Sequence, residues 1–161
     1  MDGKLRNMTS VYLYDDEGIL CLYCIGSRVA NNKYVGSAGG HFEMDELNNS
    51  RACVLREMKE ELSLNESDVL DLRLRYITLR LTGGEIRQNY YFFGRLKEKR
   101  NLISSEGNLR WVPYTEIPTL EMPVSAKHMI LHYCQVGRYN ENLYTGVTEK
   151  EGTNFVPMVE F

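Results

Sequence analysis

The chain has 161 residues, 43% of them apolar, and a formal net charge of −3. This length allows a substantial core, and the apolar fraction argues against wholesale disorder. No apolar run approaches the roughly 20 residues that span a bilayer, and the first ten residues lack the apolar segment of a signal peptide. We therefore expect a single domain over residues 1–161, located in the cytoplasm and making no membrane contact.

The charges are unevenly distributed along the chain. Seven acidic and three basic residues lie between Glu43 and Glu66, whereas eight basic and two acidic residues lie between Arg73 and Arg100. An acidic cluster suits divalent cations, and a basic stretch suits phosphate oxygens. On charge alone, two differently charged solvated faces explain the pattern better. A pI of about 5.7 gives little support to nucleic-acid binding.

The first forty residues predict short strands. Met8–Tyr14 and Ile19–Ile25 are β-rich runs separated by an Asp-Asp-Glu-Gly hairpin signal, and Lys33–Ala38 adds a short strand before an expected sharp turn at Gly39-Gly40. Cys21 and Cys24 form a C-x-x-C motif. In a strand, however, residues three apart point to opposite faces, and no second Cys or His pair lies at zinc-finger spacing. Buried free thiols are favoured over a metal or redox role.

A helix followed by a long hairpin comes next. Asn48, Asn49 and Ser50 are candidate N-caps of a helix that continues to about Leu62. Leu72–Thr82 and Glu85–Leu96 are alternating runs joined by two glycines, which again indicates a hairpin. In the second run, Tyr90 and Phe92 face opposite to Tyr91 and Phe93. We expect one of these faces to be core, and the other could present a ring or Arg87 to a base or phosphate. For any single aromatic, core packing is favoured.

The last third predicts one strand, one helix and a tail. Leu109–Val112 is a short strand, and Glu121–Val136 has helical spacing and stops at Gly137, an expected C-cap. Residues 138–161 are a possible C-terminal extension with a hairpin around Glu151-Gly152. The order of strands and helices predicts an α/β (α+β) sandwich, a mixed sheet flanked by at least two helices.

Two histidines on the last predicted helix, His128 and His132, are four residues apart and could share a metal ion. The run HMILH lacks the glutamate of an H-E-x-x-H motif, so a structural role is favoured.

The first predicted helix carries an acidic edge. At about 100° per residue, Glu57, Glu60 and Glu61 fall within an arc of roughly 100°, with Arg56 beside them. These carboxylates repel one another, and a hard divalent cation such as Mg²⁺ would relieve the repulsion. Taken alone, the helix is better explained as a solvated acidic face with an Arg56–Glu60 ion pair.

The residues before this helix change that balance. The segment from Gly39 to Leu64 resembles the Nudix box, G-x5-E-x7-R-E-U-x-E-E-x-G-U, in which U is apolar. Eight of its nine fixed places are matched, by Gly40, Glu46, Arg56, Glu57, Met58, Glu60, Glu61 and Leu64. Two features depart from the pattern. Nine residues rather than seven separate Glu46 from Arg56, and Ser63 replaces the glycine, where a positive φ would be less comfortable.

The resemblance implies a Nudix α/β/α sandwich whose box forms a loop–helix–loop. It also implies hydrolysis of a nucleoside diphosphate linked to another group, with Mg²⁺ or Mn²⁺ as cofactor. Glu60 and Glu61 are the leading metal ligands, Glu57 a third ligand or hydrogen-bond partner, and the backbone around Gly40 a further ligand. Arg56 would orient the carboxylates.

Four further residues complete the expected site. By resemblance, Glu46 would brace the loop, and Glu106, in the loop ahead of the Trp111 strand, would be a ligand or base. A solvated loop acid explains Glu106 equally well. His41 and Arg87 are candidates for contact with the substrate.

The sequence says less about the substrate. No proline lies between Leu64 and Trp111, which weakens an ADP-ribose substrate, and signatures of NADH or coenzyme A members are absent. By analogy with short family members, we expect a nucleoside triphosphate or an oxidised nucleotide such as 8-oxo-dGTP. A nucleotide sugar or ADP-ribose is the alternative, and a capped RNA end stays open.

Two other classes of function remain. A catalytically idle Nudix-like ligand-binding module should have lost box carboxylates, and none is missing. An isomerase on the same fold is least favoured. A homodimer is compatible with the fold, but no segment of the sequence identifies an interface.

Overall fold

The computed structural model describes residues 3–27 and 30–159. These residues form two α-helices, α1 (Ser50–Leu62) and α2 (Val124–Gln135), and short 3₁₀ helices η1 (Met44–Glu46), η2 (Glu66–Asp68), η3 (Ile117–Thr119) and η4 (Gly137–Tyr139). The strands are β1 (Lys4–Tyr14), β2 (Gly18–Cys24), β3 (Tyr34–Val35), β4 (Ala38–His41), β5 (Val69–Thr82), β6 (Glu85–Leu96), β7 (Gly107–Pro113), β8 (Tyr144–Val147) and β9 (Val156–Pro157). None of these helices is long and apolar enough to cross a membrane.

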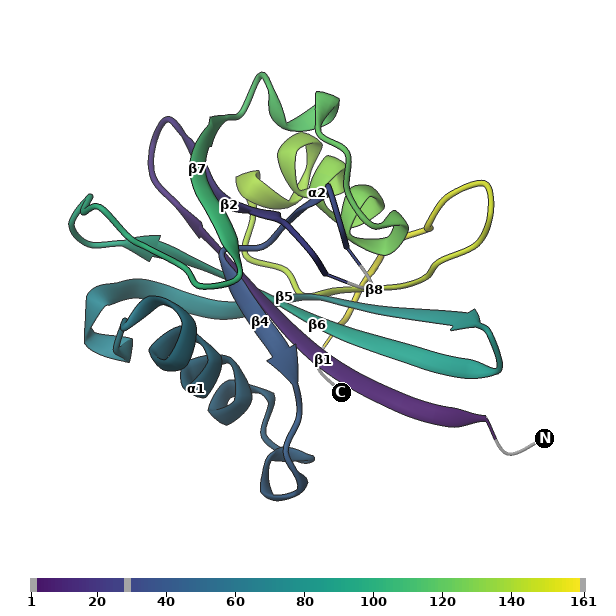
Figure 1. The fold of residues 1–161 in the computed structure, drawn as a ribbon. Coiled ribbons are helices and arrows are strands. Elements are labelled where there is room, and N and C mark those ends of the chain that lie inside the picture. Colours follow the sequence, from purple (N-terminus) through teal and green to yellow (C-terminus); the bar gives the residue numbers. More distant parts are fainter. Residues whose placement is uncertain (1–2, 28–29, 160–161) are drawn as a thin grey trace.

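The strands form one mixed sheet in the order β3-β2-β1-β6-β5-β8-β9. β1 runs parallel to β6 along its whole length, and β6 pairs antiparallel with β5. The opposite edge of β1 is divided between β4, which pairs with Met8–Val11, and β2, which pairs with Leu13 and Tyr14. Because of this split, the two glycines of β4 lie beside the middle of β1 while β2 turns away with β7 (Figure 1).

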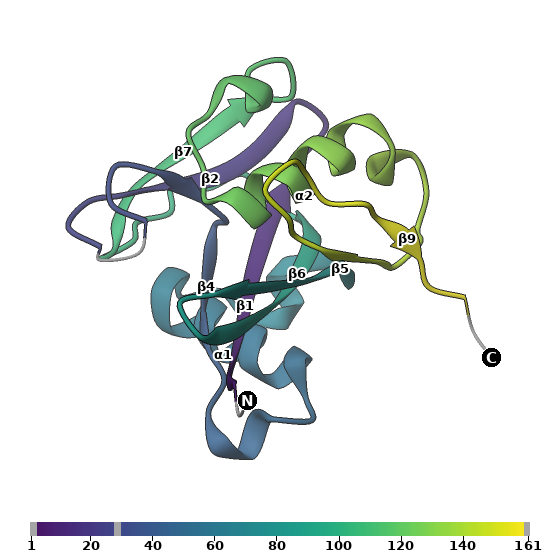
Figure 2. The same cartoon turned by 90° about the vertical axis from the view of Figure 1, so that its right-hand side faces the viewer.

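Helices cover both faces of the sheet (Figures 1 and 2). α1 packs Val54, Met58 and Leu62 against one face, together with Val11, Leu13 and Phe92. α2 packs Met129, Ile130 and Tyr133 against the other face, together with Tyr12, Tyr76 and Phe93. The predicted sandwich, a mixed sheet flanked by helices, is therefore confirmed.

Both hairpins of the main sheet form where the sequence predicts them. At the first, Asp15 Oδ1 accepts hydrogen bonds from the N–H groups of Glu17 and Gly18 (2.8 and 2.9 Å). At the second, Gly83 and Gly84 have φ of 59° and 76°, the positive angles that a two-residue hairpin turn requires. At the C-terminus, β8 and β9 pair antiparallel, as expected for a hairpin around Glu151-Gly152. The last two residues of the expected 138–161 extension lie outside the described residues.

Four expectations about glycines and element ends are wrong. Lys33–Ala38 is not one strand, and Gly39-Gly40 make no turn, because both glycines are extended in β4 and pair with Ser10 and Thr9. α2 begins at Val124 rather than Glu121, since the residue before Pro123 is disfavoured in a helix. Gly137 is not a left-handed cap. It opens η4, and a Cβ there would overlap the Tyr76 hydroxyl.

Core packing, the favoured use of the β6 aromatics, is found on both faces of the strand. Tyr91 and Phe93 are buried under α2, whereas Phe92 is buried under α1, with Tyr90 packed beside it. Both faces are core because each is covered by a helix.

Candidate active site

The ends of α1 fix the position of its acidic edge. Asn49 caps the start, with its Oδ1 accepting a hydrogen bond from the Ala52 N–H (3.0 Å). At the other end Ser63 is left-handed (φ 56°, ψ 28°), and the N–H groups of Ser63 and Leu64 bond to the Lys59 and Met58 carbonyls. Ser63 thus takes the conformation usually given to glycine at a helix C-terminus.

Arg56 is the centre of a hydrogen-bonded cluster at the start of the site. Its guanidinium donates to both carboxylate oxygens of Glu46 (2.7 and 3.0 Å), to Glu57 Oε1 (2.7 Å), to Glu60 Oε2 (3.1 Å) and to the His41 carbonyl (3.0 Å). Glu46 is buried and lies on η1, so the nine residues between it and Arg56 do not prevent the contact. The Arg56 guanidinium lowers the pKa of Glu46 to about 2.

Glu57 lies directly against the glycines of β4. The residue is buried, and a Cβ added to Gly40 would overlap its carboxylate. A glycine at position 40 is therefore required for close approach of the helix and not for a turn. The Glu57 carboxylate therefore lies directly against the β4 backbone at Gly40.

Glu61 faces the same strand one helical turn further along. Its Oε2 accepts a hydrogen bond from the Gly39 N–H (3.2 Å). Burial, followed by the neighbouring charges of Glu57 and Glu106, raises the pKa of Glu61 to about 7. The negative charges of Glu57 and Glu106 therefore act on Glu61 from α1 and from the β6–β7 loop.

These carboxylates open onto a cavity of about 660 Å³ between the sheet, β4 and the start of α2. Glu57, Glu61, Glu106, Gly40 and Arg56 line it. So do the predicted substrate candidates His41 and Arg87. The Nε2 atom of His41 is 3.0 Å from Arg6 Nη2, and burial together with the Arg6 charge lowers the His41 pKa.

Glu60 is placed differently from Glu57 and Glu61. Its side chain is 58% exposed, does not line the cavity and is held at the rim by Arg56. In residues 3–27 and 30–159, no three His, Cys, Asp or Glu side chains are grouped closely enough to hold a metal ion. The carboxylate oxygens of Glu57 and Glu61 suit a hard cation, but Glu57 Oε1 already accepts a hydrogen bond from Arg56.

The cavity also contains residues that the sequence analysis did not single out. Arg80 and Asn89 line it from β5 and β6, and Ser125 lines it from the first turn of α2. The sequence does contain a signal for Arg80. Arg80 and Arg87 are equally spaced from the Gly83-Gly84 turn, so a two-residue hairpin makes them cross-strand partners.

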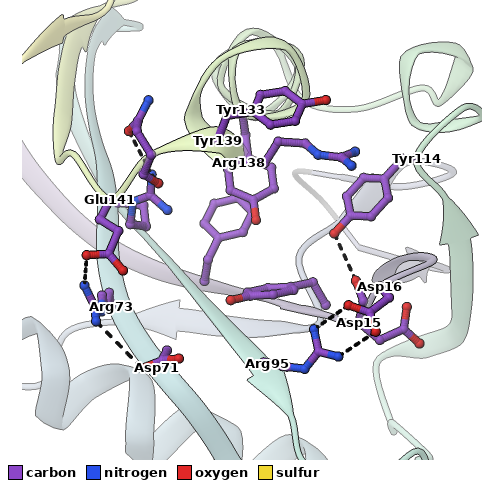
Figure 3. Close-up of a pocket in the computed structure, with 14 residues that line it drawn as sticks. Asp15, Asp16, Asp71, Arg73, Arg95, Tyr114, Tyr133, Arg138, Tyr139 and Glu141 are labelled. Atoms are coloured by element: carbon purple, nitrogen blue, oxygen red, sulfur yellow. Dashed lines mark hydrogen bonds and ion pairs between the residues drawn. The ribbon is translucent and has the colours of Figure 1, made fainter.

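A second pocket of about 450 Å³ lies at the other end of the α2 side and is lined by Tyr14, Tyr114, Tyr133 and four arginines (Figure 3). Arg73 pairs with Asp71 and Glu141, and Arg95 with Asp16. Arg75 donates hydrogen bonds to the backbone carbonyls of residues 137, 140 and 142. Arg138 stacks on Tyr114, with its Cζ atom 3.9 Å from the ring centroid. Its cations are all engaged within the chain.

The remaining candidates have structural positions. Cys21 and Cys24 are buried free thiols, as expected. His128 Nδ1 is bonded to Thr153 Oγ1 (3.0 Å) and His132 Nδ1 to the Tyr76 hydroxyl (2.8 Å), so the two imidazoles have separate partners.

Comparison with known proteins agrees with this architecture. A MutT protein from Bacillus halodurans has a similar fold (TM-score 0.63, 21% identity, 94% of each chain covered). So do a Nudix hydrolase from Nitrosomonas europaea (TM-score 0.70, 13% identity, 93% of this chain and 82% of that one) and a C. elegans Ap4A hydrolase (TM-score 0.65, 12% identity, 85% and 99%). No curated protein matches the sequence. The family model described as NUDIX domain matches residues 4–133, and the chain therefore belongs to the NUDIX domain family and is a pyrophosphohydrolase enzyme.

Proposed function

We propose that this enzyme hydrolyses the pyrophosphate bond of a nucleoside diphosphate linked to another group, in the cavity between α1, β4 and the start of α2. The observation that carries the proposal is that Glu57, Glu61 and Glu106 all line one cavity that is large enough for a nucleotide. Negative charges that share a cavity repel one another, and a bound cation would relieve this repulsion and attract the phosphates of a substrate.

The chain's own residues divide the work as follows. Arg56 fixes the carboxylates of Glu46 and Glu57, and the glycines of β4 allow the helix to approach the strand. Glu106, exposed at the cavity mouth, is our candidate for the base that accepts a proton from the attacking water. The water oxygen bonds to one phosphorus as the bridging P–O bond breaks.

Glu57, Glu60 and Glu61, with the backbone of Gly40, would hold Mg²⁺ or Mn²⁺. When bound, the ion would neutralise the negative charge on the phosphate oxygens. Phosphoryl transfer depends mainly on such electrostatic stabilisation and requires little covalent chemistry from the protein. For Glu60 to contribute, its carboxylate must leave Arg56 and turn from the rim into the cavity.

The test is divalent-dependent release of phosphate, pyrophosphate or nucleoside monophosphate from a panel of nucleotides. The panel includes nucleoside triphosphates, 8-oxo-dGTP, nucleotide sugars, ADP-ribose, a dinucleoside polyphosphate and capped RNA. We expect turnover of at least one small nucleotide, with triphosphates and 8-oxo-dGTP as the first candidates.

Variants connect the turnover to the site. Glu57→Gln and Glu60→Gln should each lower kcat by at least about 10²-fold, the scale of losing one electrostatic stabiliser of a transition state. Glu98→Gln, an exposed change outside the cavity, is the matched control and should retain activity. Absence of turnover on the whole panel would instead favour a ligand-binding module, and unchanged turnover in folded Glu60→Gln would remove Glu60 from the mechanism.

A further inference from the structure

Three arginines lie side by side on β1, β6 and β5, near the end of the sheet where the β5–β6 hairpin turns. Arg6 of β1 is the Cα partner of Arg87 of β6, and Arg87 is the Cα partner of Arg80 of β5. Residues directly opposite in adjacent strands point to the same face, so these side chains share the α2 face of the sheet. We call Arg6, Arg87 and Arg80 the arginine row.

The arginine row is only partly neutralised within the chain. One carboxylate, Glu85, is ion-paired with both Arg6 (3.6 Å) and Arg87 (3.7 Å) and balances one of the three charges, and Arg6 Nη2 lies 3.0 Å from His41 Nε2. Arg80 has no ion pair or hydrogen bond with any residue that the structure describes, although it is half-buried. The Nε of Arg87 is buried without a hydrogen-bond partner. Like charges directly opposite one another in a sheet are destabilising, and a buried donor without a partner adds a further cost.

The second pocket gives the contrast within the same molecule. Its arginines are paired with acidic side chains, carbonyls or rings (Figure 3), so they hold loops together and leave little charge for a ligand. Arg80 and Arg87 line the candidate active-site cavity instead. Arg80 has no partner and Arg87 shares its carboxylate with Arg6, so the two guanidinium groups can bind an anion in the cavity.

The arginine row is separated from the carboxylates. Gly40 pairs with Thr9 of β1, whereas Arg87 pairs with Arg6. At about 3.3 Å per residue, these two positions on β1 are about 10 Å apart along the sheet, and Arg80 lies one strand further away than Arg87. The anion that the row binds is therefore placed away from the phosphates at Glu57 and Glu61.

We infer that the substrate carries a second phosphate group on its ribose, at the 2′ or 3′ position, and that Arg80 and Arg87 bind it. This inference rests on the proposed function for the position of the cleaved pyrophosphate. Asn89 lies on the same face between Arg87 and Tyr91 and also lines the cavity.

Calorimetric titration tests the inference without any turnover. The probes are adenosine 5′-monophosphate, adenosine 5′-diphosphate, and the adenosine 2′,5′- and 3′,5′-bisphosphates. We expect one bisphosphate to bind at least about tenfold more tightly than the monophosphate, with the two bisphosphates identifying the ribose position. In Arg80→Gln and Arg87→Gln this preference should fall below about threefold.

Arg73→Gln is the matched control, because Arg73 lies on the same strand as Arg80 but outside the cavity and is paired with Glu141. It should keep the full preference. Equal binding of mono- and bisphosphates by the wild type would overturn the inference. So would a preference retained in Arg80→Gln, or an Arg80 effect confined to the 5′-diphosphate, which would assign the row to the pyrophosphate itself. If the bisphosphate preference is found but neither the panel compounds nor a nucleoside 5′-diphosphate derivative that carries the preferred ribose phosphate are hydrolysed, the proposed function fails and the anion site stands.

Discussion

At the scale of single residues, Ser63 replaces the glycine of the family pattern, and this replacement costs conformational energy. Its left-handed conformation (φ 56°) is reached easily by glycine and less easily by any residue with a Cβ. Because the backbone is already in the conformation that the box glycine would take, the substitution leaves the geometry of α1 intact and affects stability.

We predict that Ser63→Gly stabilises the protein by about 0.5–1 kcal/mol, by relieving the strain of a left-handed serine. Urea denaturation at neutral pH gives the value. Ser67→Gly, in the exposed η2, is the control and should be slightly destabilising, because there glycine only adds entropy to the unfolded chain. Equal effects of the two substitutions would show that the strain at Ser63 is absent.

Glu46 is a second residue whose contribution to stability can be measured separately, because its pKa is lowered in the folded protein. Its bidentate contact with Arg56 lowers its folded pKa from the ordinary 4.5 to about 2. A lowered carboxyl pKa gives stability that is present above pH 4.5 and is lost as the pH falls towards 2, because the unfolded state then binds the proton first.

We predict that Glu46→Gln lowers the free energy of unfolding at pH 7 by about 2 kcal/mol, the range for hydrogen bonds to charged groups. The difference from wild type should shrink between pH 5 and about 2 as the wild-type carboxylate is protonated. Denaturation curves across this range measure it. A difference that stays constant with pH would mean that packing of the side chain, and not its charge, is what matters.

At the scale of elements, the site depends on how closely α1 approaches β4. The box motif and its helix were readable from the sequence, because carboxylate spacing and N-capping are local properties. The reason for the glycines was not, because Gly39 and Gly40 contact Thr9 and Glu57 through tertiary packing. The same limit applies to Gly137, which makes room for Tyr76 where local patterns predict only a helix end.

We predict that Gly40→Ala lowers kcat at least about tenfold, because the added methyl group would displace the Glu57 carboxylate from the strand. Thermal unfolding measured in parallel reports whether the sheet survives. Gly3→Ala is the control, since its Cβ would meet Ile86 at an ordinary 3.6 Å. Wild-type activity in Gly40→Ala would show that the position of Glu57 does not limit turnover.

At the scale of the whole molecule, the sequence predicted the layers but not the order of the strands. Alternation of apolar residues shows which side chains of β1 and β6 face a helix, but it does not show that these strands, far apart in sequence, pair in parallel. That pairing brings Arg6 beside Arg87 and Arg80, which the hairpin already pairs. The row and the carboxylates of α1 meet in one cavity only because β4 and β2 share the edge of β1.

A fold that gathers like charges at both ends of one cavity gives up stability for function. Glu61 illustrates the cost, because burial beside Glu57 and Glu106 raises its pKa to about 7. A carboxyl whose folded pKa is raised stabilises the fold less as the pH rises from its ordinary 4.5 through about 7, since the unfolded state ionises more easily.

We predict that Glu61→Gln is more stable than wild type by about 1–2 kcal/mol at pH 8 in a chelator, while its divalent-dependent activity is lost. The gain should diminish as the pH falls below about 7, where the wild-type carboxyl holds its proton. Chemical denaturation of both proteins at pH 5 and at pH 8 measures how the stability difference depends on pH. Glu98→Gln should show no pH-dependent gain. A Glu61→Gln protein that is less stable than wild type at pH 8 would mean that the Gly39 N–H bond outweighs the crowding of charge, and that the site is assembled without cost.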